Sequence, residues 1–197
     1  MLWKTYEEFK SSLLGQGFFE PLVFGAGNEN AGILLLGEAP GGEEIKAGQP
    51  FVGRAGKNLD MFLRQIRLSR DAIYITNVVK FRPYHVGKTG RRSNRPPSRE
   101  EVALCRPCLL KEVEEICPRL IVTLGNTALN AVARETCSIG YAHGKVLQSA
   151  FSAELFALYH PASIIYNPSL KSTYLIDVEL LKEHIEVGKF LPGGTLI

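Results

Sequence analysis

Four side chains in this sequence can act together on a flat, polar ring, and they are Glu38, Phe51, Asn77 and His160. Phe51 can stack on a ring face, and Asn77 offers both a donor and an acceptor, which complement an imide edge. His160 can donate to a carbonyl oxygen that gains charge during a reaction, and Glu38 can order or deprotonate a water. Taken singly, the acid, the amide and the imidazole also have structural interpretations, as a capping or solvated carboxylate, a turn residue and a partner of a loop carbonyl.

The elements that must position these side chains are short apolar runs, which we expect to be strands at residues 33–36, 73–76, 120–124 and 155–159. Helical patterns alternate with them at residues 3–14, 57–68, 98–116, 126–134 and 168–189, and a weaker strand is expected at 145–148. This alternation predicts an α/β fold, with a single domain over residues 1–197 built as a three-layer α/β/α sandwich around a central four-stranded parallel sheet. Ligand sites in such sheets lie at the carboxyl ends of the strands, and Glu38, Asn77 and His160 follow such ends.

Residues 37–56, GEAPGGEEIKAGQPFVGRAG, join the first expected strand to the next helix and contain six glycines. Glycine lets backbone N–H groups approach a ligand closely, so we interpret this stretch as a ligand loop. A long surface loop that merely tolerates glycine is the alternative. A phosphate cradle of the P-loop kind is disfavoured, because the Lys-Ser/Thr ending of that motif is missing.

The charge of the chain is concentrated in one segment, although the net charge is only +3. Between Asp71 and Glu100 there is no acidic residue, whereas the same window holds Lys80, Arg82, Lys88, Arg91, Arg92, Arg95 and Arg99. Such a segment indicates a polyanionic partner, with a solvated loop as the alternative. Its glycines and prolines predict a flexible loop that orders on contact.

The expected compartment is the cytoplasm. No apolar run approaches the roughly 20 residues of a membrane span, and the first residues do not have the pattern of a signal peptide. We therefore expect the four cysteines, at positions 105, 108, 117 and 137, to be reduced thiols. We expect no membrane partner and a monomeric protein.

The motifs GEAPG, PFVGRAG, YITNVVK, NRPPS, CRP, VTLG and HPAS, in this order, closely resemble the uracil-DNA glycosylase superfamily, and most of all the group called family four. The resemblance spans about residues 32–183. It implies excision of uracil from DNA after the nucleotide flips into a cleft. It also implies that Glu38 orients the hydrolytic water, Phe51 stacks on the base, Asn77 reads the uracil edge and His160 stabilises the leaving oxyanion.

The resemblance further implies which residues surround the substrate. The backbone at Gly37, Ala39 and Gly41 is expected to line the pocket. The segment of Ile164, Ile165 and Tyr166 resembles a DNA-penetrating loop that fills the space of the flipped base, or else begins the core face of the last helix. Phosphates are expected to be held by Lys80, Arg82, Arg91, Arg92 and Arg95.

Two departures from the family concern a cofactor and a covalent adduct. Family-four proteins usually hold an iron–sulfur cluster on four cysteines, but here only Cys105 matches and Phe81 stands after TNVVK. We therefore expect no cofactor and no metal, although a replacement site from the four cysteines is conceivable. A related subgroup carries a nucleophilic His where this chain has Asn94, so we expect turnover and not a trapped adduct, with His85 as the remaining alternative.

The function expected from the sequence is therefore that of a monofunctional uracil-DNA glycosylase, a DNA repair hydrolase that leaves an abasic site. One alternative is a glycosylase for another deaminated base, hypoxanthine or xanthine, since an Asn can present either face of its amide. Another is a protein that binds or covalently traps uracil-containing DNA without turnover.

Overall fold

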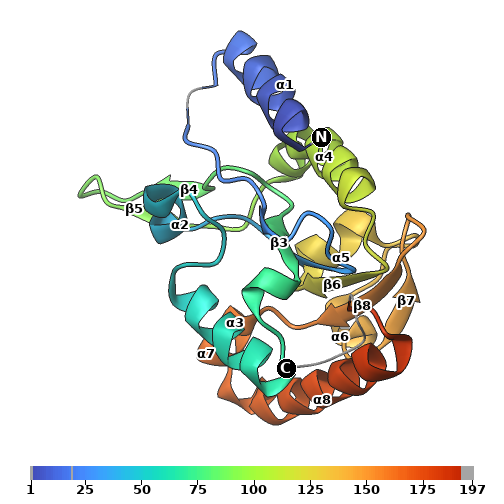
Figure 1. Cartoon of the computed structure of the whole chain (residues 1–197). Coiled ribbons are helices and arrows are strands. Elements are labelled where there is room, and N and C mark those ends of the chain that lie inside the picture. The colour runs from blue at the N-terminus through green and yellow to red at the C-terminus, as the bar shows by residue number, and fades with distance from the viewer. Residues whose placement is uncertain (1, 19, 192–197) are drawn as a thin grey trace.

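The computed structural model describes residues 2–18 and 20–191, with the side chains of residues 165 and 166 outside that description. A six-stranded sheet of order β1-β3-β2-β6-β8-β7 forms the middle layer (Figure 1). Its four inner strands are parallel, and they are β2 (Ile33–Gly37), β3 (Tyr74–Asn77), β6 (Leu120–Leu124) and β8 (Glu154–Leu158). The expected α/β fold and its four parallel strands are thus confirmed.

The two edge strands correct the expected sheet. β1 (Ala26–Gly27) pairs antiparallel with β3, and β7 (Val146–Gln148) pairs antiparallel with β8, so the sheet is mixed and has six strands instead of four. β1 has only two residues, both exposed, and carries no apolar run that could announce a strand. β7 is the weaker strand expected at residues 145–148.

Successive side chains of the inner strands point to opposite faces of the sheet and into two separate cores. The sheet therefore lies between two layers of helices. Ile33 and Leu35 of β2 contact one core, with α3 (Arg54–Gln65) and α8 (Lys171–Gly188). Leu34 and Leu36 contact the other, with α4 (Arg99–Ile116) and α5 (Asn126–Val132). Strands buried on both faces need such continuous apolar runs. The helix α1 (Leu2–Gly15) packs outside, against α4.

The helix boundaries follow local signals in most places. Ser98 caps α4 as expected, because the Glu101 N–H donates to its hydroxyl at 3.2 Å and its own N–H donates to the Glu101 carboxylate at 2.7 Å. The last expected helix, at residues 168–189, consists of the 3₁₀ turn η2 (Pro168–Leu170) followed by α8, and a further short helix that was not expected, α7 (Pro161–Tyr166), precedes it. The remaining short elements are α6 (Ile139–Ala142) and the 3₁₀ turn η1 (Arg70–Ala72).

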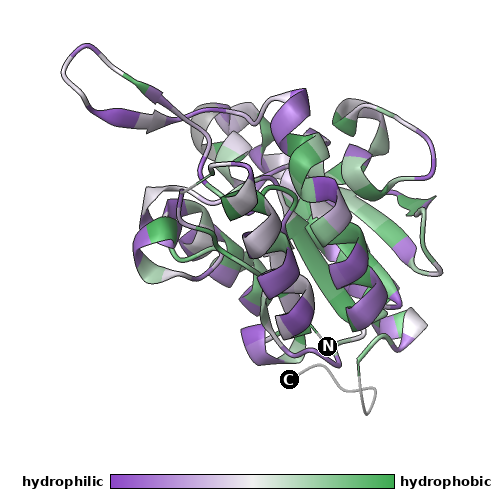
Figure 2. Ribbon diagram, turned by 90° about the horizontal axis from the view of Figure 1, so that it is seen from above, coloured by the Kyte–Doolittle hydropathy of each residue, from purple (hydrophilic) through white to green (hydrophobic). Residues whose placement is uncertain are grey.

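Two stretches expected to be loops contain regular structure. The stretch 37–56 includes the helix α2 (Gly42–Ala47). The basic segment forms an antiparallel hairpin of β4 (Tyr84–Val86) and β5 (Arg92–Asn94). Figure 2 shows this hairpin standing away from the layered body, with hydrophilic residues along much of its length. A projecting polar hairpin is suited to contacting a partner, which is the role that the sequence predicted for a flexible loop in this segment.

None of the helices in the described part of the chain combines the length and apolar character that a membrane crossing requires.

Candidate active site

A cavity of about 730 Å³ opens at the carboxyl ends of the parallel strands. Its walls include Glu38 after β2, Asn77 at the end of β3 and His160 after β8. Phe51 joins them from the connection between α2 and α3. The fold therefore brings together all four side chains that can act on a flat polar ring. Two of the expected backbone positions, Ala39 and Gly41, also lie in the wall.

Phe51 lies under the cavity in a strained backbone conformation. Its φ of 55° is in the left-handed region, and only 5% of the residue is exposed. The Arg70 guanidinium donates to the Phe51 carbonyl at 2.6 Å, and Gly56 packs so closely that a Cβ there would lie 1.9 Å from the same oxygen. The Phe51 ring lies 6.3 Å from the His160 ring at an interplanar angle of 25°. The contacts thus hold the aromatic face at the place where a ring can stack.

Asn77 presents its amide toward the cavity, although only 3% of the residue is exposed. In the described part of the chain, its side chain makes no hydrogen bond. Gly37 pairs with Asn77 across the sheet, and a Cβ on Gly37 would lie 2.4 Å from the Asn77 Oδ1 and from the Phe51 Cζ. Gly37 therefore makes room for both side chains, and the amide keeps its donor and acceptor for a ligand.

His160 is held as a neutral donor. Its Nδ1 accepts from the Ala162 N–H at 3.1 Å, at the beginning of α7. Burial lowers the pKa of the imidazole to about 4, so the ring is neutral at pH 7. A neutral ring whose Nδ1 accepts must carry its proton on Nε2. That N–H is the group available to an oxygen in the cavity.

Glu38 is fixed through one of its two carboxylate oxygens. The Thr127 hydroxyl, from the first turn of α5, donates to the Glu38 Oε2 at 2.5 Å. This contact leaves Oε1 to bond a water or to face a positive charge. Thr127 was not predicted as a site residue, because a threonine within a short helix has no pattern that points to a distant acid.

A second acid, Glu44, organises the loop around the cavity and was also missed. It is buried, and its carboxylate accepts from the N–H groups of Gly41 at 3.0 Å, Val52 at 3.1 Å and Gly53 at 2.7 Å. These three bonds join the beginning of α2 to the stretch that follows Phe51. The Glu three residues after Gly41 is the signal that could have predicted the helix.

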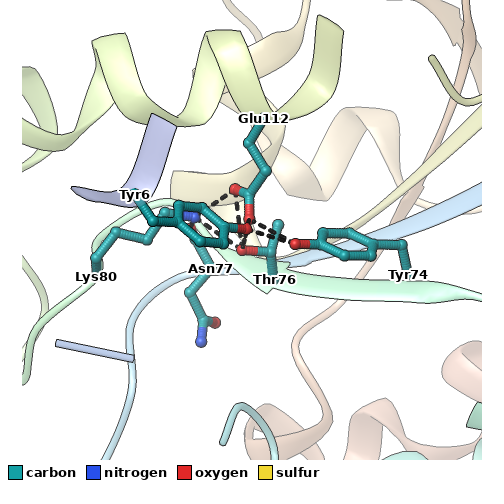
Figure 3. Close-up of polar contacts among 6 residues, drawn as sticks. All are labelled: Tyr6, Tyr74, Thr76, Asn77, Lys80 and Glu112. Atoms are coloured by element: carbon teal, nitrogen blue, oxygen red, sulfur yellow. Dashed lines mark hydrogen bonds and ion pairs between the residues drawn. The ribbon is translucent and has the colours of Figure 1, made fainter. Parts of the chain in front are cut away.

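Lys80 lies in the core and not at the position expected from the sequence. We expected it to hold DNA phosphates, but its side chain is fully buried and its Nζ pairs with Glu112 at 2.5 Å. A lysine with no exposed surface has no access to a phosphate, so that expectation is wrong. The physical reason is its position on the turn after β3, from which the side chain points into the core and not into the basic hairpin (Figure 3).

The other expected phosphate contacts lie on or beside the hairpin, and most have partners. Arg82 donates to the Asn94 amide oxygen at 2.7 Å, and Arg92 lies 4.3 Å from the centre of the Tyr84 ring. Arg95 forms a bidentate pair with Glu101, at 2.6 and 2.7 Å. Arg91, in contrast, is exposed and has no ion pair within the described residues.

The expected DNA-penetrating segment falls in α7. Ile164 is half-buried and packs against the core that contains α3 and α8, which favours the alternative that it serves the core. The side chains of Ile165 and Tyr166 lie outside the described residues.

The four cysteines do not gather into a metal site. Cys105 and Cys108 are buried in α4, where burial raises the pKa values of their thiols to about 11 and about 12. Cys117 is exposed, and no group of three or more potential metal ligands occurs within the described residues. The Phe81 ring lies 4.6 Å from the Phe18 ring. An iron–sulfur cluster needs several thiolates at one place, which these positions do not offer within the described residues.

The fold and the cavity define an α/β protein with a cavity lined by polar and aromatic side chains at the carboxyl edge of its sheet. The chain belongs to the uracil-DNA glycosylase superfamily, because the family described as "Uracil DNA glycosylase superfamily" matches residues 24–179. It is homologous to the type-4 uracil-DNA glycosylases, which are hydrolases of DNA repair.

Three relatives indicate the extent of the similarity. The type-4 uracil-DNA glycosylase of Archaeoglobus fulgidus is 40% identical over 168 residues, covering 82% of this chain and 80% of that protein. The type-4 enzyme of Thermotoga maritima is 39% identical over 168 residues, covering 84% and 83%. The type-5 uracil-DNA glycosylase of Pyrobaculum aerophilum is 32% identical over 176 residues, covering 80% and 70%. The resemblance expected from the motifs is confirmed.

Proposed function

We propose that this protein removes uracil from DNA by hydrolysing the N-glycosidic bond and leaving an abasic site. The observation that carries the proposal is the unpaired amide of Asn77, which faces a cavity beside the Phe51 ring and the neutral His160. An amide with a free donor and a free acceptor matches the N3–H and O4 edge of uracil. Homology with the type-4 enzymes supports the same substrate.

The proposed reaction follows from the geometry of the cavity. The flipped base stacks on Phe51, and the bond between C1′ and N1 breaks with its electron pair leaving on uracil. The His160 Nε2–H donates to the O2 oxygen on which negative charge develops. Glu38, held through Oε2 by Thr127, uses Oε1 to orient water and to stabilise the cationic sugar. The water oxygen bonds to C1′, and the proton that the water loses neutralises the uracil anion.

Asn94 supports turnover in preference to a stable adduct. It lies in the wall of the cavity, where its amide oxygen accepts from Arg82 and its Nδ2 is within 3.0 Å of where a Gly41 Cβ would be. An amide held in this way is not a nucleophile for the deoxyribose. His85, the alternative nucleophile, is exposed on β4 and does not line the cavity.

We also propose that the reaction needs no iron–sulfur cluster. The chemistry described above uses only a carboxylate, an imidazole, an amide and an aromatic ring. The packing of Phe81 on Phe18 supports an apolar connection of the N-terminal segment to the body. A visible absorption spectrum of the purified protein, with iron and sulfide analysis, tests this point, and a brown protein with four irons would contradict it.

The hairpin is proposed to hold DNA through its unpaired cations. Exchanging Lys88 and Arg91 for Ser should weaken DNA binding and lower the slope of log affinity against log salt by about 1 for each phosphate that is no longer neutralised. Lys10→Ser on the exposed surface of α1 is the control. An unchanged slope in the double variant would show that the hairpin cations are only solvated.

The assay for the proposed function is release of free uracil from an oligonucleotide with one uracil, followed under single-turnover conditions. Glu38→Gln and His160→Asn should each lower the rate by about 100-fold or more, as expected for the loss of a group that acts on developing charge. Competition with a hypoxanthine-containing duplex tests base identity. Release of hypoxanthine in preference to uracil, or full activity of both variants, would overturn the proposal.

A further inference from the structure

A buried polar cluster lies on the opposite side of Asn77 from the cavity. It consists of Tyr6, Tyr74, Thr76, Lys80 and Glu112 (Figure 3). The side chains of Lys80 and Glu112 are 0% exposed, and their ion pair is the centre of the cluster. Figure 3 shows the Asn77 amide pointing away from this cluster. The side chain of Asn77 therefore faces the cavity, whereas its backbone carbonyl faces the cluster.

Within the cluster, both charged groups are fully bonded. The Lys80 Nζ donates to the Thr76 hydroxyl at 2.7 Å, to Glu112 at 2.5 Å and to the Asn77 carbonyl at 2.8 Å. The Glu112 carboxylate also accepts from Thr76 at 3.0 and 3.1 Å, from Tyr74 at 3.1 Å and from Tyr6. Three ammonium protons thus meet three acceptors, as a buried lysine requires.

The bond to the Asn77 carbonyl makes the cluster relevant to the site. The same turn is joined to the loop of the proposed water-orienting acid, because the Val78 N–H donates to the Gly37 carbonyl and the Val79 N–H to the Glu38 carbonyl, each at 3.0 Å. The turn after β3 is therefore held from the cavity side by backbone bonds and from the core side by the Lys80 ammonium.

We propose that Lys80 is a positioning residue, which holds the Asn77 peptide so that its amide meets the edge of the base. Glu112 is the counter-ion that keeps the ammonium charged and oriented in the core. The hydroxyl of Tyr6 extends the cluster to α1, so the N-terminal helix contributes to the same support. This inference depends on the proposed function, since the reading of a base by Asn77 is what the cluster would serve.

Stability alone does not explain the ion pair. Apolar residues of similar volume often stabilise a core as well as a buried ion pair does, because the pair loses its hydration. A buried lysine that bonds a carbonyl of the base-reading residue has a geometric role that an apolar side chain does not have. The two explanations differ in whether the effect of removing Lys80 passes through Asn77.

A double-mutant cycle separates these explanations. Lys80→Met together with Glu112→Gln removes both charges, keeps the volume and leaves an amide that accepts from the Tyr6 and Thr76 hydroxyls. The rate of uracil release per folded molecule should fall by about 10- to 100-fold, because a misplacement of about 1 Å between the base and the groups that act on it lowers a catalysed rate by up to about that factor. The decrease should appear in kcat. In an Asn77→Ala background the same two substitutions should change the rate less than about twofold.

The matched control is an exposed Lys–Glu pair between α4 and α1. Lys111 of α4 and Glu8 of α1 lie 3.2 Å apart, with more than half of each side chain exposed. Lys111→Met with Glu8→Gln should leave the rate unchanged in both backgrounds. If the buried double variant does not fold, Thr76→Val gives a milder test, because it removes one acceptor of Lys80 and keeps the volume.

The outcomes are distinguishable. An inactive wild-type protein would contradict the proposed function. An active wild type, with a buried double variant that is equally active when folded, would overturn the positioning role of Lys80. A loss of activity that is equally large in the wild-type and the Asn77→Ala backgrounds would also overturn it, since an effect that acts through Asn77 must disappear when Asn77 is replaced.

Discussion

The cavity and the buried cluster are two polar regions that share Asn77, and they differ in how their hydrogen bonds are satisfied. In the cluster, Lys80 and Glu112 bond each other and their neighbours completely. In the cavity, the Asn77 amide makes no bond within the described residues, and the His160 ring uses only one nitrogen. Bonded polar groups stabilise a conformation, whereas unbonded ones at a cavity wall are available to a ligand.

Residue type alone does not distinguish the two regions. Lys80 and Arg91 are both basic residues of one segment, yet the first is fully buried and the second is exposed. A buried charge needs specific partners, and an exposed one does not. Substitutions in the cluster and in the cavity both test this difference between the two regions.

The largest effect is expected from breaking the cluster at one charge only. Lys80→Met alone leaves Glu112 buried without its counter-ion, so the free energy of unfolding should fall by about 3–5 kcal/mol. Denaturant unfolding measures the loss, and adding Glu112→Gln should restore much of it. A stability close to that of the wild type would show that Glu112 takes up a proton or reaches solvent.

The next effect comes from closing the space that the cavity depends on. Gly37→Ala places a Cβ 2.4 Å from both Asn77 and Phe51, so these side chains must move. We expect uracil release to fall by about 100-fold. Gly140→Ala in α6 is the control, because a Cβ there meets nothing within 4 Å. Equal activity of the two variants would contradict the close packing of Gly37.

A smaller effect concerns pH and depends on the neutral imidazole of His160 in the cavity. Because the pKa of His160 is lowered to about 4, the unfolded chain binds a proton near pH 6.5 that the folded chain does not bind. Stability should therefore decrease as pH falls from 6.5 toward 4, by about 2 kcal/mol at pH 5. The free energy of unfolding of His160→Asn should not show this decrease between pH 6.5 and pH 4. An NMR titration of the ring with a midpoint near 6.5 would contradict it.

The smallest effect is expected at the support of Glu38. Thr127→Val removes the hydroxyl that bonds Oε2, and a bond to a charged group contributes about 1.5 kcal/mol, so the rate should fall about tenfold. Thr123→Val is the matched control, because the buried Thr123 hydroxyl has no partner within the described residues. If both variants behave alike, Glu38 is oriented by other contacts.

Much of the fold followed from patterns along the chain. Residues 33–36 and 120–124 are apolar throughout except for Thr123, which predicts strands buried on both faces. The Ser98 capping box predicted the first turn of α4. The edge strands did not follow, because an edge strand is formed by pairing with a neighbour and β1 has no apolar pattern of its own.

The candidate site was predictable as far as it depends on strand ends. Glu38, Asn77 and His160 each follow a parallel strand, and parallel strands end at one edge, so their convergence was contained in the order of the elements. The contacts of Thr127 with Glu38 and of Lys80 with Glu112 join positions 89 and 32 residues apart. Such contacts depend on how helices pack on the sheet.

The sequence by itself thus determined the class of fold, the family and four of the side chains at the cavity, because periodicity and ordered motifs are local properties of the chain. Only the tertiary structure decided which of the polar residues are free and which are bonded. Lys80 shows why, since its charge is a property of the sequence, but its burial depends on α4 bringing Glu112 beside it. Burial is a property of the assembled layers, and it made a residue expected at the DNA into a support for Asn77.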